Sequence, residues 1–147
     1  MRKFNYRLHS LEDFRKERLR TAQKELRKIR DEFKSEKETL GLLTNQREDY
    51  RARLKDKSHA FLELNELNWY KEYLHLLEEK IKEKKQDLKR LRQNLIQLKK
   101  LTKKREKEKK TLEKNRLAKF TQFLAELRKE EQKELDEVSR ALSHKSF

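Results

Sequence analysis

The 147-residue sequence contains one glycine, no proline and no cysteine. A compact domain of this length needs many turns, and turns are built mainly from Gly, Pro, Asn and Asp. The near absence of glycine and proline, without clusters of Asn or Asp to replace them, argues against a globular domain. Without cysteine there are no disulfides, which fits a cytoplasmic protein. No apolar run reaches about 18 residues, so we expect no membrane span. Charged residues interrupt the N-terminal stretch, so we expect no signal peptide.

The sequence also lacks the usual motifs of nucleotide-binding and metal sites. The single Gly41 excludes a phosphate-binding loop or a dinucleotide-binding loop. The four histidines are scattered, none is three or four residues from another, and no cysteine could complete a zinc site. We therefore expect no catalytic residue, no metal, no cofactor and no small-molecule substrate.

Charged residues make up 47% of the chain and hydrophobic residues 33%. This composition is typical of long helices and coiled coils, but disordered chains share its low hydrophobicity and high net charge. Periodicity decides between the two. From residue 22 a seam of positions recurs in steps of four and three, and eight of its ten members are apolar: Ala22, Leu26, Ile29, Phe33, Glu36, Leu40, Leu43, Arg47, Tyr50 and Leu54. Such spacing indicates a left-handed coiled coil.

A second seam of the same kind begins at Tyr70, and eight of its nine members are apolar: Tyr70, Leu74, Leu77, Ile81, Lys84, Leu88, Leu91, Leu95 and Leu98. The phase breaks between the two seams, which predicts a connection over about 56–65, where Ser58 or Asn65 could cap the next helix. We predict one domain with helix 1 over about 4–55 and helix 2 over about 66–142.

The two seams match if the chain folds back on itself. Pairing residues whose numbers add to 124 gives every layer at least one apolar side chain, and it sets Phe33 against Leu91 and Phe4 against Phe120. The predicted fold class is therefore all-α, a long two-helix antiparallel coiled-coil hairpin with a C-terminal helical overhang. Periodicity alone leaves a parallel dimer open. The overhang keeps an apolar stripe without an intrachain partner, which is typical of a binding surface.

Two further features are uneven along the chain. Residues 80–116 carry 17 Lys and Arg against 5 Asp and Glu, so most of the net charge of +15 lies there. This segment could be a solvated face, a docking surface for an acidic protein, or a nucleic-acid-binding surface.

Five of the twelve aromatic residues lie between 50 and 73: Tyr50, Phe61, Trp69, Tyr70 and Tyr73. Trp69 and Tyr73 lie four residues apart on one flank of helix 2, either packed on the turn, where Phe61 could receive them, or exposed as a binding anchor.

The order of these features resembles FliJ, the small coiled-coil protein of the flagellar type III export apparatus. The resemblance rests on "LHSLEDFRKERLRTAQKEL", "LLTNQREDYRARL", "NWYKEYLHLLEEKI" and "KKTLEKNRLAKF" with "ELDEVSR", and it covers nearly the whole chain. YscO-type proteins of injectisomes are similar. The resemblance implies a non-enzymatic, cytoplasmic stalk, peripheral at the inner membrane, that binds an export ATPase hexamer (FliI), an export-gate membrane protein (FlhA) and export chaperones.

The resemblance also implies two sets of contact residues. Exposed positions near the turn would contact the gate, and they fall on Leu43, Tyr50, Tyr73 and Leu77. The end with both termini would enter the ATPase ring through Phe4, Leu8, Phe120, Phe123, Leu124, Leu127 and Val138. The alternatives from the residues alone are a coiled-coil scaffold with unrelated partners and a basic helical nucleic-acid-binding protein, although no aromatic platform interleaves with the basic run.

Overall fold

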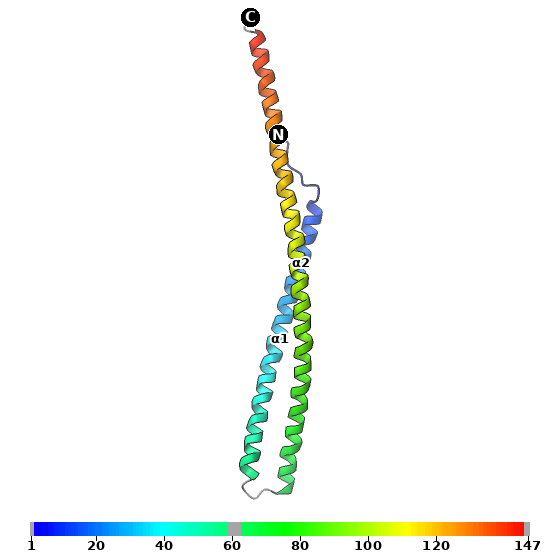
Figure 1. Ribbon diagram of the computed structural model, residues 1–147, viewed down its shortest axis with the longest axis vertical. Helices are drawn as coiled ribbons and strands as arrows, with labels where there is room; N and C mark the ends of the chain where they lie inside the picture. Colours follow the sequence, from blue (N-terminus) through cyan, green and yellow to red (C-terminus); the bar gives the residue numbers. More distant parts are fainter. Residues whose placement is uncertain (1, 59–62, 146–147) are drawn as a thin grey trace. The chain divides into compact units, whose positions relative to one another are not determined.

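The computed structural model describes residues 2–58 and 63–145. It contains two α-helices, α1 (His9–Ser58) and α2 (Leu64–Lys145), and no strand among the described residues. Figure 1 shows them joined at one end as an antiparallel pair. The predicted all-α helical hairpin is confirmed. Its contacts divide into two units, which are described separately: unit 1 combines Met1–Thr21 with Lys103–Phe147, and unit 2 is Ala22–Thr102.

Unit 2 buries the two predicted seams. All ten seam positions from Ala22 to Leu54 are buried or half-buried, and so are all nine from Tyr70 to Leu98. The deepest side chains are Ala22, Leu77, Ile81 and Leu95. An antiparallel pair of helices has a single line of contact, so most side chains outside the seam are exposed. The hydrophobic free energy of this unit therefore comes almost entirely from the seam.

Two of the three polar residues in the seams, Glu36 and Lys84, pair with each other. Lys84 Nζ donates a hydrogen bond of 2.7 Å to Glu36 Oε2 across the helices. This bond raises the pKa of Lys84 above its usual value. A single complementary polar pair costs stability relative to two leucines but disfavours shifted registers.

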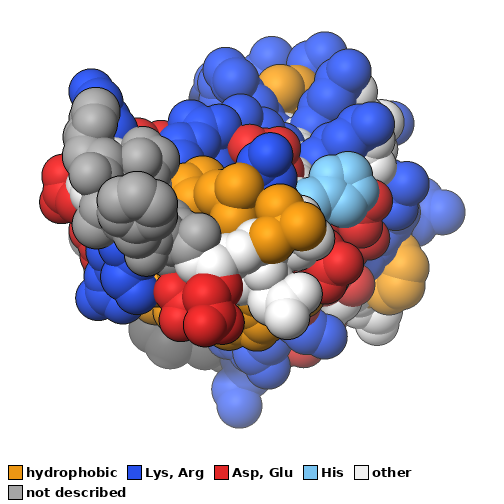
Figure 2. Space-filling model, turned by 90° about the horizontal axis from the view of Figure 1, so that it is seen from below, with side chains coloured by type: hydrophobic (Ala, Val, Ile, Leu, Met, Phe, Trp, Pro, Cys, Tyr) orange, Lys and Arg blue, Asp and Glu red, His pale blue; other side chains and the backbone are white. Residues whose placement is uncertain are grey.

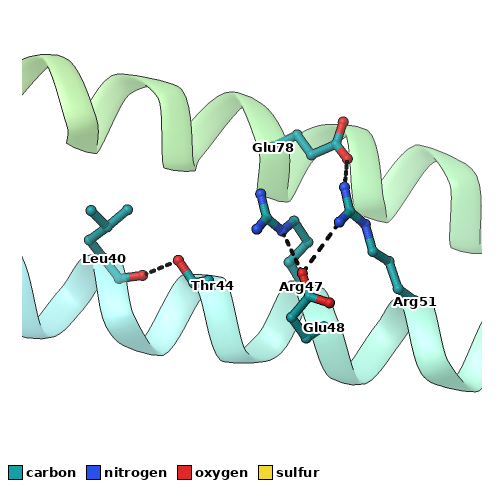
Figure 3. Close-up of polar contacts among 6 residues, drawn as sticks. All are labelled: Leu40, Thr44, Arg47, Glu48, Arg51 and Glu78. Carbon is teal, nitrogen blue, oxygen red and sulfur yellow. Dashed lines mark hydrogen bonds and ion pairs between the residues drawn. The ribbon is translucent and has the colours of Figure 1, made fainter.

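A second ionic contact flanks the seam nearer the turn. Arg51 of α1 donates to Glu78 of α2 at 2.8 Å and to Glu48 one turn back at 3.3 Å. Arg47, which the sequence places in the seam, turns its Nε to Glu48 at 3.3 Å. Figure 3 shows the three charged residues of α1 gathered below Glu78. The exposed members of this network add little stability each, but they fix which flanks of the two helices adjoin.

The two helices extend further into the predicted connection, about 56–65, than the sequence suggested. α1 continues to Ser58 and α2 begins at Leu64. The amides of Glu66 and Leu67 donate to the Glu63 carbonyl, so α2 starts directly after Glu63 and not after a side-chain cap on Asn65. Residues 59–62, and with them the proposed role of Phe61 under the aromatic residues, lie outside the described part.

In unit 1, α1 starts at His9 and not near residue 4, so the predicted start of helix 1 is wrong. Residues 2–6 have no regular structure. Phe4 packs its ring on Phe120 and Phe123, at centroid distances of 5.2 and 5.5 Å. The Tyr6 hydroxyl donates to Asn115 Oδ1 at 2.6 Å. These contacts with α2 hold the segment outside the helix, because tertiary packing outweighs local helix preference. The predicted pairing of Phe4 with Phe120 is confirmed.

The core of unit 1 contains a carboxylate. Glu12 is 1% exposed, and Leu19 and Leu112 are the buried hydrophobic side chains described in this unit. Its Oε1 accepts from Arg116 at 3.0 Å and from Lys16 at 3.5 Å. Its Oε2 has no partner among the described residues. Removing Arg116 would leave a buried charge poorly compensated, which is strongly destabilising.

The last part of α2 lacks lateral packing. Among the described contacts between the N-terminal segment and α2, the ion pair of Arg2 with Glu130 lies nearest to the C-terminal end of α2. From residue 131 to 144 every side chain is exposed, including Leu135, Val138 and Leu142. The end of α2 without lateral packing therefore begins about one helical turn beyond Leu127, which is half-buried like Phe123.

Candidate functional site

The end of unit 2 near the turn carries an aromatic cluster, made of Tyr50 from α1 and Trp69, Tyr70 and Tyr73 from α2. Tyr50 and Tyr73 have ring centroids 4.5 Å apart. Trp69 and Tyr73 stack at 5.5 Å with planes only 6° apart. Trp69 touches Tyr70 edge-on at 5.2 Å. Four rings in mutual contact form a rigid surface, since aromatic side chains lose little rotamer freedom on binding.

Exposure separates the members of this cluster. Tyr70 is buried in the seam, Tyr50 and Tyr73 are half-buried, and Trp69 is 53% exposed. Seen from the turn end, hydrophobic side chains form an exposed patch bordered by acidic and basic groups (Figure 2). Leu64, at 72% exposed, is among the apolar residues of this end. Such a patch with a polar border has the anatomy of a protein-binding surface.

Two cations adjoin the cluster. Lys57 Nζ donates to the Tyr70 hydroxyl at 2.8 Å and lies 4.9 Å from the ring centroid. The hydrogen bond to Tyr70 raises the pKa of Lys57 above its usual value. The Arg53 guanidinium lies 5.3 Å from the Tyr50 centroid. Both contacts orient the tyrosines and leave the indole of Trp69 facing solvent.

The residues assigned to a gate contact by resemblance are not equally accessible. Leu43, Tyr50 and Tyr73 are half-buried, but Leu77 is only 2% exposed. The expectation that Leu77 is exposed is wrong, because it occupies a seam position and faces α1. The structure brings Tyr50 and Tyr73 into contact, and it adds Trp69, which the resemblance left out. In the sequence, the four-residue spacing between Trp69 and Tyr73 already indicated that the two lie on one flank of the helix.

Unit 1 carries a second surface, the terminal groove, between the N-terminal segment and α2. It has a volume of about 690 Å³ and is lined by Phe4, Leu8 and Phe123 together with basic and amide side chains. A smaller hollow of about 280 Å³ adjoins it between Phe4, Leu117 and Phe120. Among the seven residues assigned to an ATPase contact by resemblance, Phe4, Leu8, Phe120 and Phe123 therefore come together.

The other three continue along α2. Leu124 is 37% exposed, Leu127 is half-buried, and Val138 is 55% exposed at a distance from the groove. Sequence reasoning missed the buried Glu12 in this unit. The signal was present, since steps of three and four backwards from Ala22 pass through Leu19, Arg15 and Glu12.

Further chemistry is limited in the described residues. They contain no group of three or more His, Cys, Asp or Glu side chains that could hold a metal ion. No helix in the described part is long and apolar enough to cross a membrane. What the structure does present are two surfaces, each built from both helices or their extensions and each rich in aromatic or apolar side chains.

A pair of long antiparallel helices packed along two apolar seams defines an all-α coiled-coil hairpin. Residues 4–146 match the family of the flagellar FliJ protein, and the chain belongs to this family. Its members are non-enzymatic components of the flagellar type III export apparatus and work with partner proteins there, so the resemblance in the sequence is confirmed.

One solved structure, a putative YscO homolog from Chlamydia trachomatis, shares the fold. The TM-score is 0.55 at 18% sequence identity, and the alignment covers 97% of this chain and 96% of the other. A search of curated proteins gave no match.

Proposed function

We propose that this chain is the stalk and adaptor of the flagellar export apparatus, at the cytoplasmic side of the inner membrane. The end with both termini enters the ring of the export ATPase, the aromatic cluster meets the export-gate membrane protein, and export chaperones bind along the helices. Family membership supports the setting, and the two surfaces support the division of contacts.

The proposed ATPase contact rests mainly on the end of α2, where exposed apolar side chains have no described packing partner. Leu135, Val138 and Leu142 follow steps of three and four residues, so they lie on one face, and all are more than half exposed. Apolar side chains in a continuous stripe with no intrachain partner indicate a surface that is covered in an assembly. The terminal groove, with Phe4 and Phe123, extends this apolar surface toward the N-terminal segment.

The test is stimulation of ATP hydrolysis by the hexameric export ATPase. Leu135→Ala with Val138→Ala should reduce stimulation at least tenfold, because two exposed apolar contacts in a binding surface are together worth more than about 1.4 kcal/mol. Lys133→Ala with Arg140→Ala changes the opposite side of the same helix and serves as the control. Neither pair alters a packed residue, so helicity should be unchanged.

Full stimulation by the Leu135 and Val138 double variant would show that this end does not enter the ring. Equal loss in both pairs would instead mean that the effect follows from the helix end in general and not from its apolar face.

A further inference from the structure

One side of unit 2 carries basic residues on both helices. The ion pair between Arg51 and Glu78 identifies the flanks of α1 and α2 that adjoin. Seven-residue steps from Glu78 along α2 reach Lys85, Arg92 and Lys99, and steps of seven from Arg51 back along α1 reach Thr44, Lys37 and Arg30. After the first pair, no carboxylate appears on either line.

The next positions outward on the same side are also basic, except for the exposed Ile96 on α2. We call the set the basic stripe, and its nine members are Arg27, Arg30, Lys34, Lys37, Lys82, Lys85, Lys89, Arg92 and Lys99. All nine are exposed. On α2 the stripe is about 25 Å long, from the rise of ~1.5 Å per residue. Asp31 and Glu38 lie one step further round α1, on the side away from α2.

The stripe is not explained by stability. Continuing the Arg51–Glu78 pairing along the hairpin sets Lys37 level with Arg92 and Arg30 level with Lys99. A coiled coil gains from opposite charges at these flanking positions and loses from like charges. Among the described residues, no carboxylate forms an ion pair with any member of the stripe, whereas Lys84 and Arg51 nearby each have one.

We infer that the basic stripe binds an anionic phospholipid surface. Two adjoining helices place their cations side by side along one face, where they can meet a plane of phosphate groups together. Each basic residue close to an anionic membrane strengthens adsorption by about fivefold. The stripe thus supplies a membrane contact by electrostatics, without an inserted helix.

Other polyanions fit less well. A third helix lying between α1 and α2 on this side would need apolar residues at the inner positions, and these are Arg30, Lys37, Thr44, Lys85 and Arg92. In duplex nucleic acid each phosphate strand winds around the helix axis, so a straight row of cations would follow a strand over only part of the stripe. A lipid surface can face the whole length.

The experiment measures sedimentation of the full chain with vesicles of phosphatidylcholine, with and without about 30% phosphatidylglycerol, at ~0.1 M salt. The triple substitution Lys85→Gln, Arg92→Gln and Lys99→Gln should weaken binding to the anionic vesicles on the order of 100-fold. The matched control is Lys28→Gln, Lys80→Gln and Arg90→Gln. It removes three exposed cations outside the stripe and should cost less than about tenfold, since screening confines the attraction to nearby charges.

Thermal melting separates binding from folding, because relief of the like-charge contacts should leave the midpoint of the stripe variant equal or higher. Three results would overturn the proposal: no binding to anionic vesicles, equal losses in the two triple variants, or tighter binding of a DNA duplex with the same dependence on the stripe. ATPase stimulation should be unchanged in the stripe variant, so this test stands apart from that of the proposed stalk function.

Discussion

Replacing Leu77 by alanine asks whether this residue serves the seam or a partner protein. Leu77 is 2% exposed, while its neighbour Leu76 is 46% exposed on the same turn of α2. A buried Leu→Ala change costs about 2–5 kcal/mol through lost burial and the cavity left behind. Because only two helices surround the site, it can partly collapse, so we expect the lower end, about 2–3 kcal/mol.

For a chain of this size, that loss corresponds to a fall of about 5–10 °C in the thermal midpoint. Leu76→Ala removes the same atoms from an exposed position and should cost about 0.5 kcal/mol or less. The assay is circular dichroism at 222 nm during heating, combined with denaturant unfolding of both variants. Equal midpoints for the two variants would refute the seam position of Leu77 and restore it as a candidate surface contact.

Three other predictions address the hairpin, the aromatic cluster and the glycine. Cysteines introduced at Phe33 and Leu91 should crosslink within one chain; a crosslink between two chains at Phe33 would instead indicate a parallel dimer. Tyr73→Ala should weaken gate binding by roughly 1–3 kcal/mol, as for a hot-spot residue, and Trp69→Ala should weaken it comparably with little change in the midpoint; a titration that shows wild-type affinity for both variants would make the cluster purely structural. Gly41→Ala should raise unfolding free energy by about 0.5–1 kcal/mol, because nothing lies within 4 Å of the added methyl group; a lower midpoint would contradict this.

The seam could be predicted residue by residue because a two-helix coiled coil depends on one local repeat. Glu36 and Lys84 interrupted that repeat on separate helices. In the predicted register they lie in neighbouring layers, and their long side chains meet across the helices. The start of α1 could not be found in this way. Phe4 continues the helical pattern, but its packing on Phe120 and Phe123 depends on the path of a distant part of α2.

The candidate surfaces were predicted less completely than the fold. Tyr73 and Phe120 were identified through the family resemblance, which transfers positions but not exposure, so Leu77 was included although the seam pattern already predicted its burial. The contact between Tyr50 and Tyr73 depends on side-chain directions across two helices, and the stacking of Trp69 on Tyr73 depends on their rotamers within α2. Periodicity indicates which flank a residue occupies, but it does not indicate which rings meet there.

The bare end of α2 also has a kinetic consequence. Residues 131–144 have only the backbone hydrogen bonds of a single helix and no buried side chain. A helix of this length without lateral contacts is only marginally stable in water. Its amides should therefore exchange with solvent far faster than those around Ile81 and Leu95. In the proposed complex, the ATPase ring would have to order this helix end as it binds. The conformational entropy lost in this step reduces the affinity and shortens the lifetime of the complex. The proposed complex with the ATPase ring should therefore dissociate faster than its contact area alone would suggest.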